Sequence, residues 1–177
     1  MMKIVVRNFL FFLLGFTVAT LSGCGQRGLP GMPKLYPATL TVFQDGKPLE
    51  NASVVLINVD PSSTWSAGGQ TDANGIVRLQ TMGQFKGIPE GTYSVAVSKI
   101  EFPDFEHPGD PPYGNAKAMK KYDEALKRYE DNTFLLVDTK YAIGVSDLKV
   151  TVTKANGKVS VDVGPPVHIK APSTPKG

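Results

Sequence analysis

Residues 69–98 read GQTDANGIVRLQTMGQFKGIPEGTYSVAVS and contain the clearest structural pattern of the chain. A turn at residues 72–75 is followed by an alternating run that starts at Ile76. A second turn, at residues 89–91, is followed by Tyr93, Val95 and Val97 on every other position. Period-two alternation bounded by glycine, proline and asparagine is typical of strands joined by turns. The stretch therefore predicts strands at residues 76–81 and 92–98.

Segments on either side of this stretch extend the pattern and predict an all-β fold. Further strands are expected at residues 39–43, 52–59, 64–67, 148–153 and 158–163. Residues 52–59 are apolar at nearly every position, as in a strand buried on both faces or central in a sandwich. Asn156 and Gly157 separate the last two segments and are the strongest short-range signal of a hairpin. Seven short strands indicate a two-sheet β-sandwich.

An insertion at residues 100–137 interrupts the strands. Its first part, EFPDFEHPGDPPYGN, is rich in proline and glycine and is expected to form a loop. Its second part, residues 116–130, is helical by propensity. Apolar side chains follow there at spacings of three and four: Met119, Tyr122, Leu126 and Tyr129. The stripe predicts a helix that covers a sandwich edge or binds a partner, and the general need to cover sheet edges favours the first.

The amino-terminal residues predict export and lipid attachment. Lys3 and Arg7 precede an apolar run at residues 9–21, and this run is too short to span a bilayer comfortably. Cys24 follows directly after small residues. The sequence Leu21, Ser22, Gly23, Cys24 resembles the lipobox of bacterial lipoproteins. The alternative, an uncleaved helix with a membrane-buried cysteine, is disfavoured by the shortness of the run.

The lipobox resemblance implies a signal peptide at residues 1–23 that is cut before Cys24. It further implies a diacylglycerol on the Cys24 thiol and an acyl chain such as palmitate on the new amino terminus. Each buried methylene contributes about 0.8 kcal/mol to attachment, so more than one chain gives an anchor that does not readily reverse. Gly25 stands where an Asp would resemble an inner-membrane retention signal. The expected location is the cell envelope, with the outer membrane favoured.

The composition is that of an ordinary globular protein. The chain has 177 residues, of which 41% are hydrophobic and 20% are charged, enough for one packed domain. Without Lys3 and Arg7, two of the 19 basic side chains, 17 basic residues stand against 16 acidic ones. The near balance gives no electrostatic argument for nucleic acid as a partner. Cys24 is the only cysteine, so no intrachain disulfide can form.

The expected organisation follows from these segments. Residues 24–37 contain glycines and three prolines and predict a flexible tether. Residues 38–164 form the sandwich domain with its insertion. Residues 165–177 are expected to be a mobile tail, with a short edge strand at residues 167–169.

A family resemblance rests on the turn and strand motifs quoted above. Thr71, Asp72 and Gly75, followed by the pattern P-x-G-x-Y-x-V-x-V from Pro89, resemble carboxypeptidase regulatory-like and transthyretin-like domains. Small lipoproteins of planctomycete-type bacteria carry similar domains, and residues 139–163 resemble their closing part. The resemblance implies a seven-stranded prealbumin-like (Ig-like) sandwich. It implies no activity, because such domains are mostly appended or surface modules.

Candidate metal ligands occur in one loop. They are Glu101, Asp104, Glu106, His107 and Asp110. This loop lacks the alternation and the sharp glycine of calcium loops, and no acidic residue follows Asp72 at the distance that a calcium loop requires. His107 and His168 have no cysteine or paired histidine nearby, so a zinc site is not expected. No metal and no cofactor are predicted.

Enzyme motifs are not found in the sequence. It contains no G-x-S-x-G elbow and no Walker pattern. Hydroxyisourate hydrolases share the transthyretin-like fold, but their activity depends on several His and Arg residues and a terminal Tyr-Arg-Gly-Ser motif. Here the chain ends in PSTPKG.

Three functional hypotheses remain. The first is a lipid-anchored envelope protein that acts as a non-catalytic structural or protein-interaction module. The second is a module that binds carbohydrate or another surface polymer, because aromatic side chains can stack on sugar rings. The candidates for stacking are Trp65, Tyr113, Tyr122 and Tyr129. The third and weakest is a transthyretin-like hydrolase.

Overall fold

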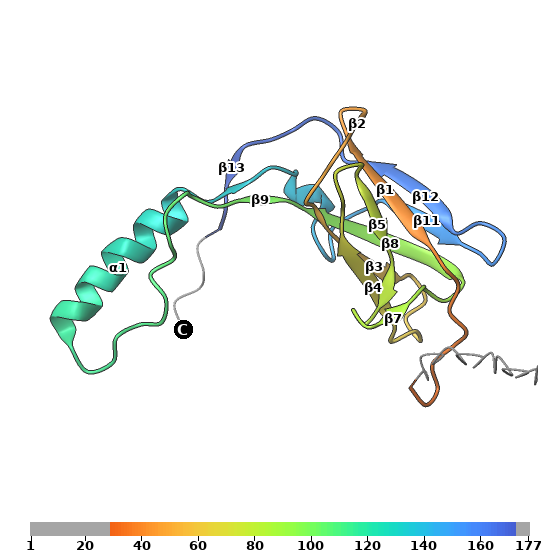
Figure 1. Ribbon diagram of the computed structural model, residues 1–177, viewed down its shortest axis with the longest axis horizontal. Helices are drawn as coiled ribbons and strands as arrows, with labels where there is room; N and C mark the ends of the chain where they lie inside the picture. Colours follow the sequence, from red (N-terminus) through yellow and green to blue (C-terminus); the bar gives the residue numbers. More distant parts are fainter. Residues whose placement is uncertain (1–28, 173–177) are drawn as a thin grey trace, which may run out of the picture.

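The computed structural model describes residues 29–172 (Figure 1). The regular structure of the described chain is mostly β-strand with one α-helix. The predicted fold class, all-β with one inserted helix, is therefore confirmed. The strands are β1 (Thr39–Gln44), β2 (Lys47–Pro48), β3 (Ser53–Asn58), β4 (Ser66–Gln70), β5 (Ile76–Arg78), β6 (Gln80–Thr81), β7 (Phe85–Lys86), β8 (Gly91–Ser98), β9 (Ile100–Glu101), β10 (Phe134–Leu135), β11 (Lys149–Val152), β12 (Lys158–Asp162) and β13 (Ile169–Lys170). The helix α1 is Ala116–Asp131, and a 3-10 turn, η1, is Thr139–Tyr141.

Two of the three sheets pack face to face and are called the sandwich below (Figure 1). The six-stranded sheet has the order β11-β8-β3-β4-β6-β7, and the four-stranded sheet has the order β12-β1-β2, with β5 also paired to β1. β1 and β12 run parallel. Inward side chains of both sheets form a single buried cluster. It includes Leu40, Val42, Val54, Leu56 and Val95.

The third sheet, β13-β10-β9, is called the neck. It joins the sandwich to α1, which stands away from both packed sheets (Figure 1). Val137, just after β10, and Tyr141 of η1 are buried in the sandwich core. The Gln44 side chain donates a hydrogen bond to the Leu136 carbonyl at 2.8 Å. These contacts attach the base of the neck to the sandwich.

The turn at residues 71–75 explains why the sequence contains T-D-x-x-G. Thr71 is 2% exposed, and its hydroxyl donates to the Leu49 carbonyl at 2.7 Å and accepts from the Ala52 N–H at 2.8 Å. The Asp72 carboxylate accepts from the backbone N–H groups of Asn74 and Ile76. Asp72 thereby closes the turn, and Thr71 ties it to the segment that leads from β2 into β3.

Gly75 is required by both its conformation and its surroundings. Its φ is +72°, a region that favours glycine. A Cβ there would lie 2.6 Å from the Val42 carbonyl oxygen. The Gly75 carbonyl also accepts from the Val42 N–H at 2.8 Å. The turn can therefore lie flat against β1 only with glycine at this position.

Tyr93 anchors the start of β8. Its side chain is fully buried, and its hydroxyl donates to the Pro89 carbonyl at 2.8 Å. Burial raises the pKa of the Tyr93 hydroxyl, and a hydrogen bond with Asn58 opposes this rise. A buried tyrosine that bonds back to the preceding corner fixes the angle at which the strand enters the sheet.

The predicted hairpin across Asn156 and Gly157 is wrong. Both strands exist, but β11 pairs with β8 in one sheet and β12 pairs with β1 in the other, so the turn crosses between the sheets. Val150 and Val161 therefore enter the core from opposite sheets instead of lying on the same face of one sheet. Gly157 has no positive φ. It is required because a Cβ would overlap the Pro37 carbonyl oxygen.

The prediction that the helix covers a sandwich edge is also wrong. α1 has no buried residue and lies beyond the neck (Figure 1). The strand predicted at residues 52–59 is confirmed as β3, which lies between β4 and β8. The alternative of burial on both faces is wrong, because Ile57 on the outer face is 40% exposed.

Several boundaries differ from the sequence-based expectation. The strand expected at residues 64–67 is β4, shifted towards the carboxyl end. The strand expected at residues 76–81 divides into β5 and β6, which pair in different sheets on either side of buried Leu79. The end of the predicted tether already pairs with the sandwich, because Tyr36 forms an antiparallel bridge with Ile88. Within the predicted tail, β13 pairs with β10.

We expect Thr71→Val to lower the free energy of unfolding by about 2 kcal/mol, because it keeps the shape but leaves the Leu49 carbonyl and the Ala52 N–H without the hydroxyl. Urea denaturation monitored by circular dichroism measures the change. The matched control is Thr41→Val on the outer face of β1, with an expected change below about 0.5 kcal/mol. Equal effects of the two substitutions would contradict the role assigned to Thr71.

Candidate functional site

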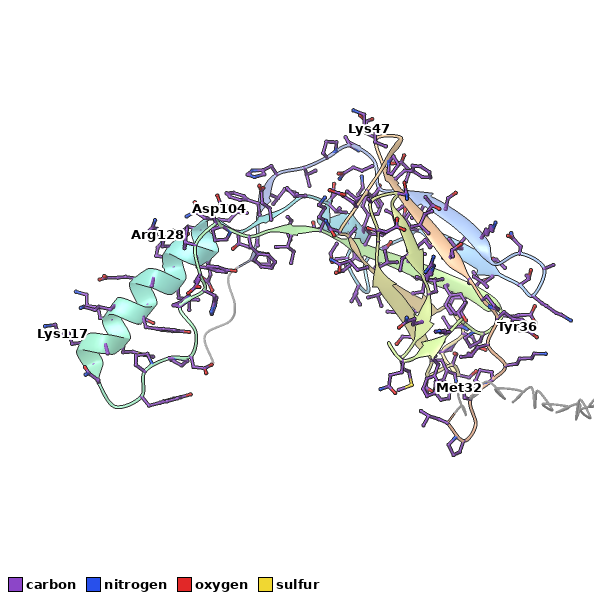
Figure 2. All side chains as sticks on the ribbon, viewed as in Figure 1. Met32, Tyr36, Lys47, Asp104, Lys117 and Arg128 are labelled. Carbon is purple, nitrogen blue, oxygen red and sulfur yellow. The ribbon has the colours of Figure 1, made fainter. Side chains whose placement is uncertain are left out.

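The most prominent surface feature is a projection from the sandwich, called the arm, which consists of residues 102–132. A loop leads out from β9 to the amino end of α1, and the helix returns to the neck (Figure 1). Figure 2 shows Lys117 at the far end of the arm, with Asp104 and Arg128 close to the neck. Tyr113, near the far end, is 90% exposed.

The helix of the arm has a defined cap at each end. The Asn115 side chain accepts from the backbone N–H groups of Lys117 and Ala118, both at 3.1 Å, which satisfies two of the otherwise unpaired donors of the first turn. At the other end, the Thr133 hydroxyl donates to the Tyr129 carbonyl at 2.9 Å. The Asn132 side chain donates to the Arg128 carbonyl at 2.8 Å. Local hydrogen bonds therefore begin and end α1 without help from the sandwich.

The apolar stripe of the helix packs against the arm's own loop. Tyr129 lies edge-on to His107, with ring centroids 4.8 Å apart, and also contacts Phe102 and Phe105. The Arg128 guanidinium lies over the Phe105 ring at 4.5 Å. The Tyr122 hydroxyl donates to the Gly109 carbonyl at 3.3 Å. Tyr122 and Tyr129 of the stripe therefore hold the helix against the arm's own loop, which the sequence did not predict.

Charged groups connect the arm to the neck. Asp131 contacts Lys127 within the helix at 2.5 Å and Lys170 of β13. Hydrogen bonds from Lys127 and then from Lys170 hold the pKa of the Asp131 carboxyl below its usual range. A lowered pKa means that this carboxylate stabilises the folded arm at higher pH, and that this contribution is lost as the pH falls through the lowered pKa.

The neck itself contains a second polar contact. His168 lies 3.2 Å from the Glu101 carboxylate and stacks on Phe134 with ring centroids 4.0 Å apart. A hollow of about 320 Å³ opens beside these three residues, at the junction of neck and arm. The aromatic stack and the hydrogen-bond contact join β9 to the segment just before β13, across β10.

The four aromatic residues proposed for sugar stacking do not come together. Tyr113, Tyr122 and Tyr129 lie on the arm, whereas Trp65 lies in the connection between β3 and β4 and is half-buried. Tyr122 and Tyr129 face the arm's own loop. Tyr113 is the one of the four that is fully open to solvent.

The acidic loop at residues 101–110 is divided among different contacts. Glu101 is paired with His168, and the His107 ring accepts from the Gly109 N–H at 3.1 Å. Among residues 29–172, no three His, Cys, Asp or Glu side chains gather in an arrangement that could hold a metal ion. Asp72 directs its carboxylate to backbone donors of its own turn.

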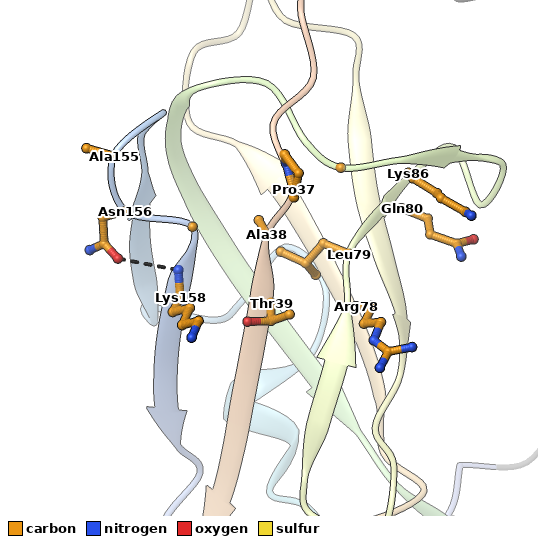
Figure 3. Close-up of a pocket in the computed structure, with 12 residues that line it drawn as sticks. Pro37, Ala38, Thr39, Arg78, Leu79, Gln80, Lys86, Ala155, Asn156 and Lys158 are labelled. Atoms are coloured by element: carbon orange, nitrogen blue, oxygen red, sulfur yellow. Dashed lines mark hydrogen bonds between the residues drawn. The ribbon is translucent and has the colours of Figure 1, made fainter. Parts of the chain in front are cut away.

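A pocket of about 760 Å³ lies at the end of the sandwich where the chain enters it, and we call it the basic pocket (Figure 3). Its lining includes three cationic side chains, from Arg78, Lys86 and Lys158, and no acidic one. Thr39 lies between Lys158 and Arg78, because β1 pairs Thr39 with both residues. The sequence reasoning missed this site, since the three strands that form it come from distant parts of the chain.

The predicted lipobox, Leu21, Ser22 and Gly23, and Cys24 lie outside the described residues, as does the predicted signal peptide. Within residues 29–172, no helix has both the length and the apolar character needed to cross a bilayer. No protein-family model matches the chain, and no curated protein or solved structure is significantly similar to it.

Proposed function

We propose that this chain is a lipid-anchored protein of the cell envelope, most consistent with the outer membrane, and that it acts as a non-catalytic protein-interaction module through its arm. The observation that carries the proposal is the position of α1, which has no buried residue and stands away from the sandwich. A helix that covered a sheet edge would be explained by the stability of the fold. The stability of the fold does not explain a helix that stands in solvent and is held by its own caps and aromatic contacts.

The anchoring part of the proposal is supported by the sequence of residues 1–24. A short apolar run after two cations, ending in Leu-Ser-Gly-Cys, is the lipoprotein pattern. The start of the described chain and the arm lie on different sides of the sandwich (Figure 2). A protein tethered by its amino terminus would therefore hold the arm clear of its own attachment point.

We also propose that the two facing sheets form a seven-stranded prealbumin-like sandwich. Seven of the strands are three residues or longer, and each overlaps one of the seven predicted strands. They lie in two facing sheets, as in a prealbumin-like sandwich. This arrangement supports the resemblance to carboxypeptidase regulatory-like and transthyretin-like domains, for which interaction modules are the expected role.

The polymer-binding alternative is less well supported by the geometry. Sugar stacking requires open aromatic faces, and two of the proposed tyrosines are occupied by the arm's loop. Tyr113 alone would remain for such a contact on the arm. No observation favours the hydrolase alternative.

We expect mass spectrometry of the mature protein from its own bacterium to show a chain that begins at an acylated Cys24. Cys24→Ala should leave residues 1–23 attached and remove the added lipid mass, because the thiol is the site of attachment. Ser22→Ala, which keeps a small residue before the cut, is the matched control and should be processed normally. A mature chain with an unmodified Cys24 would contradict lipid anchoring.

We expect a photo-crosslinking amino acid at Tyr113, in the full chain in its own bacterium, to give one discrete protein adduct. The reason is that Tyr113 lies at the exposed end of the arm. The control carries the same group at Lys47, an exposed position on β2 of the sandwich, and should not give that adduct. An adduct that resists protease but is lost on glycosidase treatment would favour the polymer-binding alternative, and identical patterns at both positions would contradict a role for the arm.

A further inference from the structure

The basic pocket has a wall of outward side chains fixed by strand pairing. Residues paired across neighbouring strands point to the same face of a sheet. Thr39 is paired with Lys158 on one side and with Arg78 on the other. Figure 3 shows the three residues on three adjacent strands, with Thr39 in the middle. Two strand spacings, about 9.5 Å, therefore separate the backbones that carry the two cations.

The charges of this wall are not balanced by ion pairs. Among residues 29–172, no carboxylate lies within ion-pair distance of the Arg78 guanidinium or the Lys158 ammonium. Glu90 lies near the turn that borders the pocket, but its carboxylate accepts from the backbone N–H of Lys154. The pocket lining contains no carboxylate, so an anion placed between the two cations would interact favourably with both.

More positive charge surrounds the same end of the sandwich. Lys86 contributes to the pocket lining, and Lys34 lies over the Tyr36 ring at 5.6 Å, where the chain pairs with Ile88. Pro37 and Leu79 add apolar wall, and Asn156 adds an amide. The pocket is therefore a concave surface with cations on both sides of a hydroxyl, which suits a tetrahedral anion whose oxygens point in several directions.

We propose that the basic pocket binds a phosphate group, and that its source is the headgroup of a phospholipid. The Arg78 guanidinium can hold two phosphate oxygens at once, and the Lys158 ammonium acts as a point charge from the other side. The Thr39 hydroxyl lies between them as a further donor. A carboxylate would present both of its oxygens in one plane and could meet only one of the two cations well.

The source of this group follows from the position of the pocket. The pocket is lined by Pro37, and Cys24 lies 13 residues earlier in the chain. Thirteen residues span at most about 45 Å when extended. On the proposed function, in which Cys24 is lipid-anchored, phospholipid headgroups of the same membrane lie within reach of the pocket. The membrane source rests on that proposed function, whereas phosphate binding itself does not.

The first experiment titrates glycerol phosphate into the full chain in a nonionic detergent at constant ionic strength, by isothermal calorimetry. We expect saturable binding, with the dissociation constant raised about tenfold by Arg78→Ala and by Lys158→Ala, because each removes one charge-assisted contact. Arg78→Lys should weaken binding less than Arg78→Ala. Melting temperatures measured without ligand show that each variant is folded.

The control is Lys47→Ala, which removes the same charge from β2, outside the pocket lining. It should bind glycerol phosphate as the unchanged chain does. The proposal is overturned if no saturable heat appears, if Lys47→Ala weakens binding as much as Arg78→Ala, or if acetate binds as tightly as glycerol phosphate.

The second experiment separates the two sources of phosphate. The full chain is attached to vesicles of phosphatidylcholine, with or without phosphatidylglycerol, and hydrogen exchange is measured at residues 37–41 and 155–160. We expect slower exchange on phosphatidylglycerol for the unchanged chain and for Lys47→Ala, but not for Arg78→Ala. Equal exchange on both vesicles would overturn the membrane source. If Cys24 proves unmodified, the calorimetry still decides whether the pocket binds phosphate.

Discussion

The sandwich depends on the buried hydrogen bonds of the Thr71 hydroxyl. At this point the chain passes between the sheets twice, once from β2 to β3 and once from β4 to β5. Thr71 joins the two passages through its hydroxyl, its N–H, which donates to the Ala52 carbonyl, and its carbonyl, which accepts from the Asn51 N–H. Buried polar groups at such a crossing must find partners within the protein, and this one residue supplies several of them.

The remaining features follow from that crossing. With β1 held against the turn by Gly75, β12 pairs beside β1, and β11 continues the other sheet beside β8. The pairing of β1 with β5 and β12 then places Arg78 and Lys158 on either side of Thr39. β8 runs on into β9, so the same framework that closes the core also directs the neck and the arm away from it (Figure 1).

Much of the fold could be predicted from local patterns, and the errors share one cause. Alternation located the strands, and helix propensity with apolar residues at spacings of three and four located α1, because both signals depend on nearby residues. Strand partners depend on the whole core. Asn156 and Gly157 resemble a hairpin turn, yet the strands on either side of them belong to opposite sheets. Gly157 is required because a Cβ there would overlap the Pro37 carbonyl oxygen.

The candidate site was predictable to a smaller degree for the same reason. The tyrosines at helical spacing do form one stripe, but the sequence could not show that the stripe would meet Phe105 and His107 of the arm's own loop. The basic pocket had no signal in the sequence, because a lysine or an arginine on an outward strand position is ordinary until its neighbours are known. Lipid attachment is a prediction from the sequence of residues 1–24, and these residues lie outside the described part of the chain.

Hydrogen exchange of the full chain in its native state shows whether the sandwich is one cooperative unit and the arm a separately stabilised projection. We expect amides of β3 and β8, and those of Asn51 and Ala52 beside Thr71, to exchange only through global unfolding. Amides of α1 should exchange through a local opening with a clearly smaller free energy. Equal protection of α1 and β3 would mean instead that the arm unfolds only together with the core.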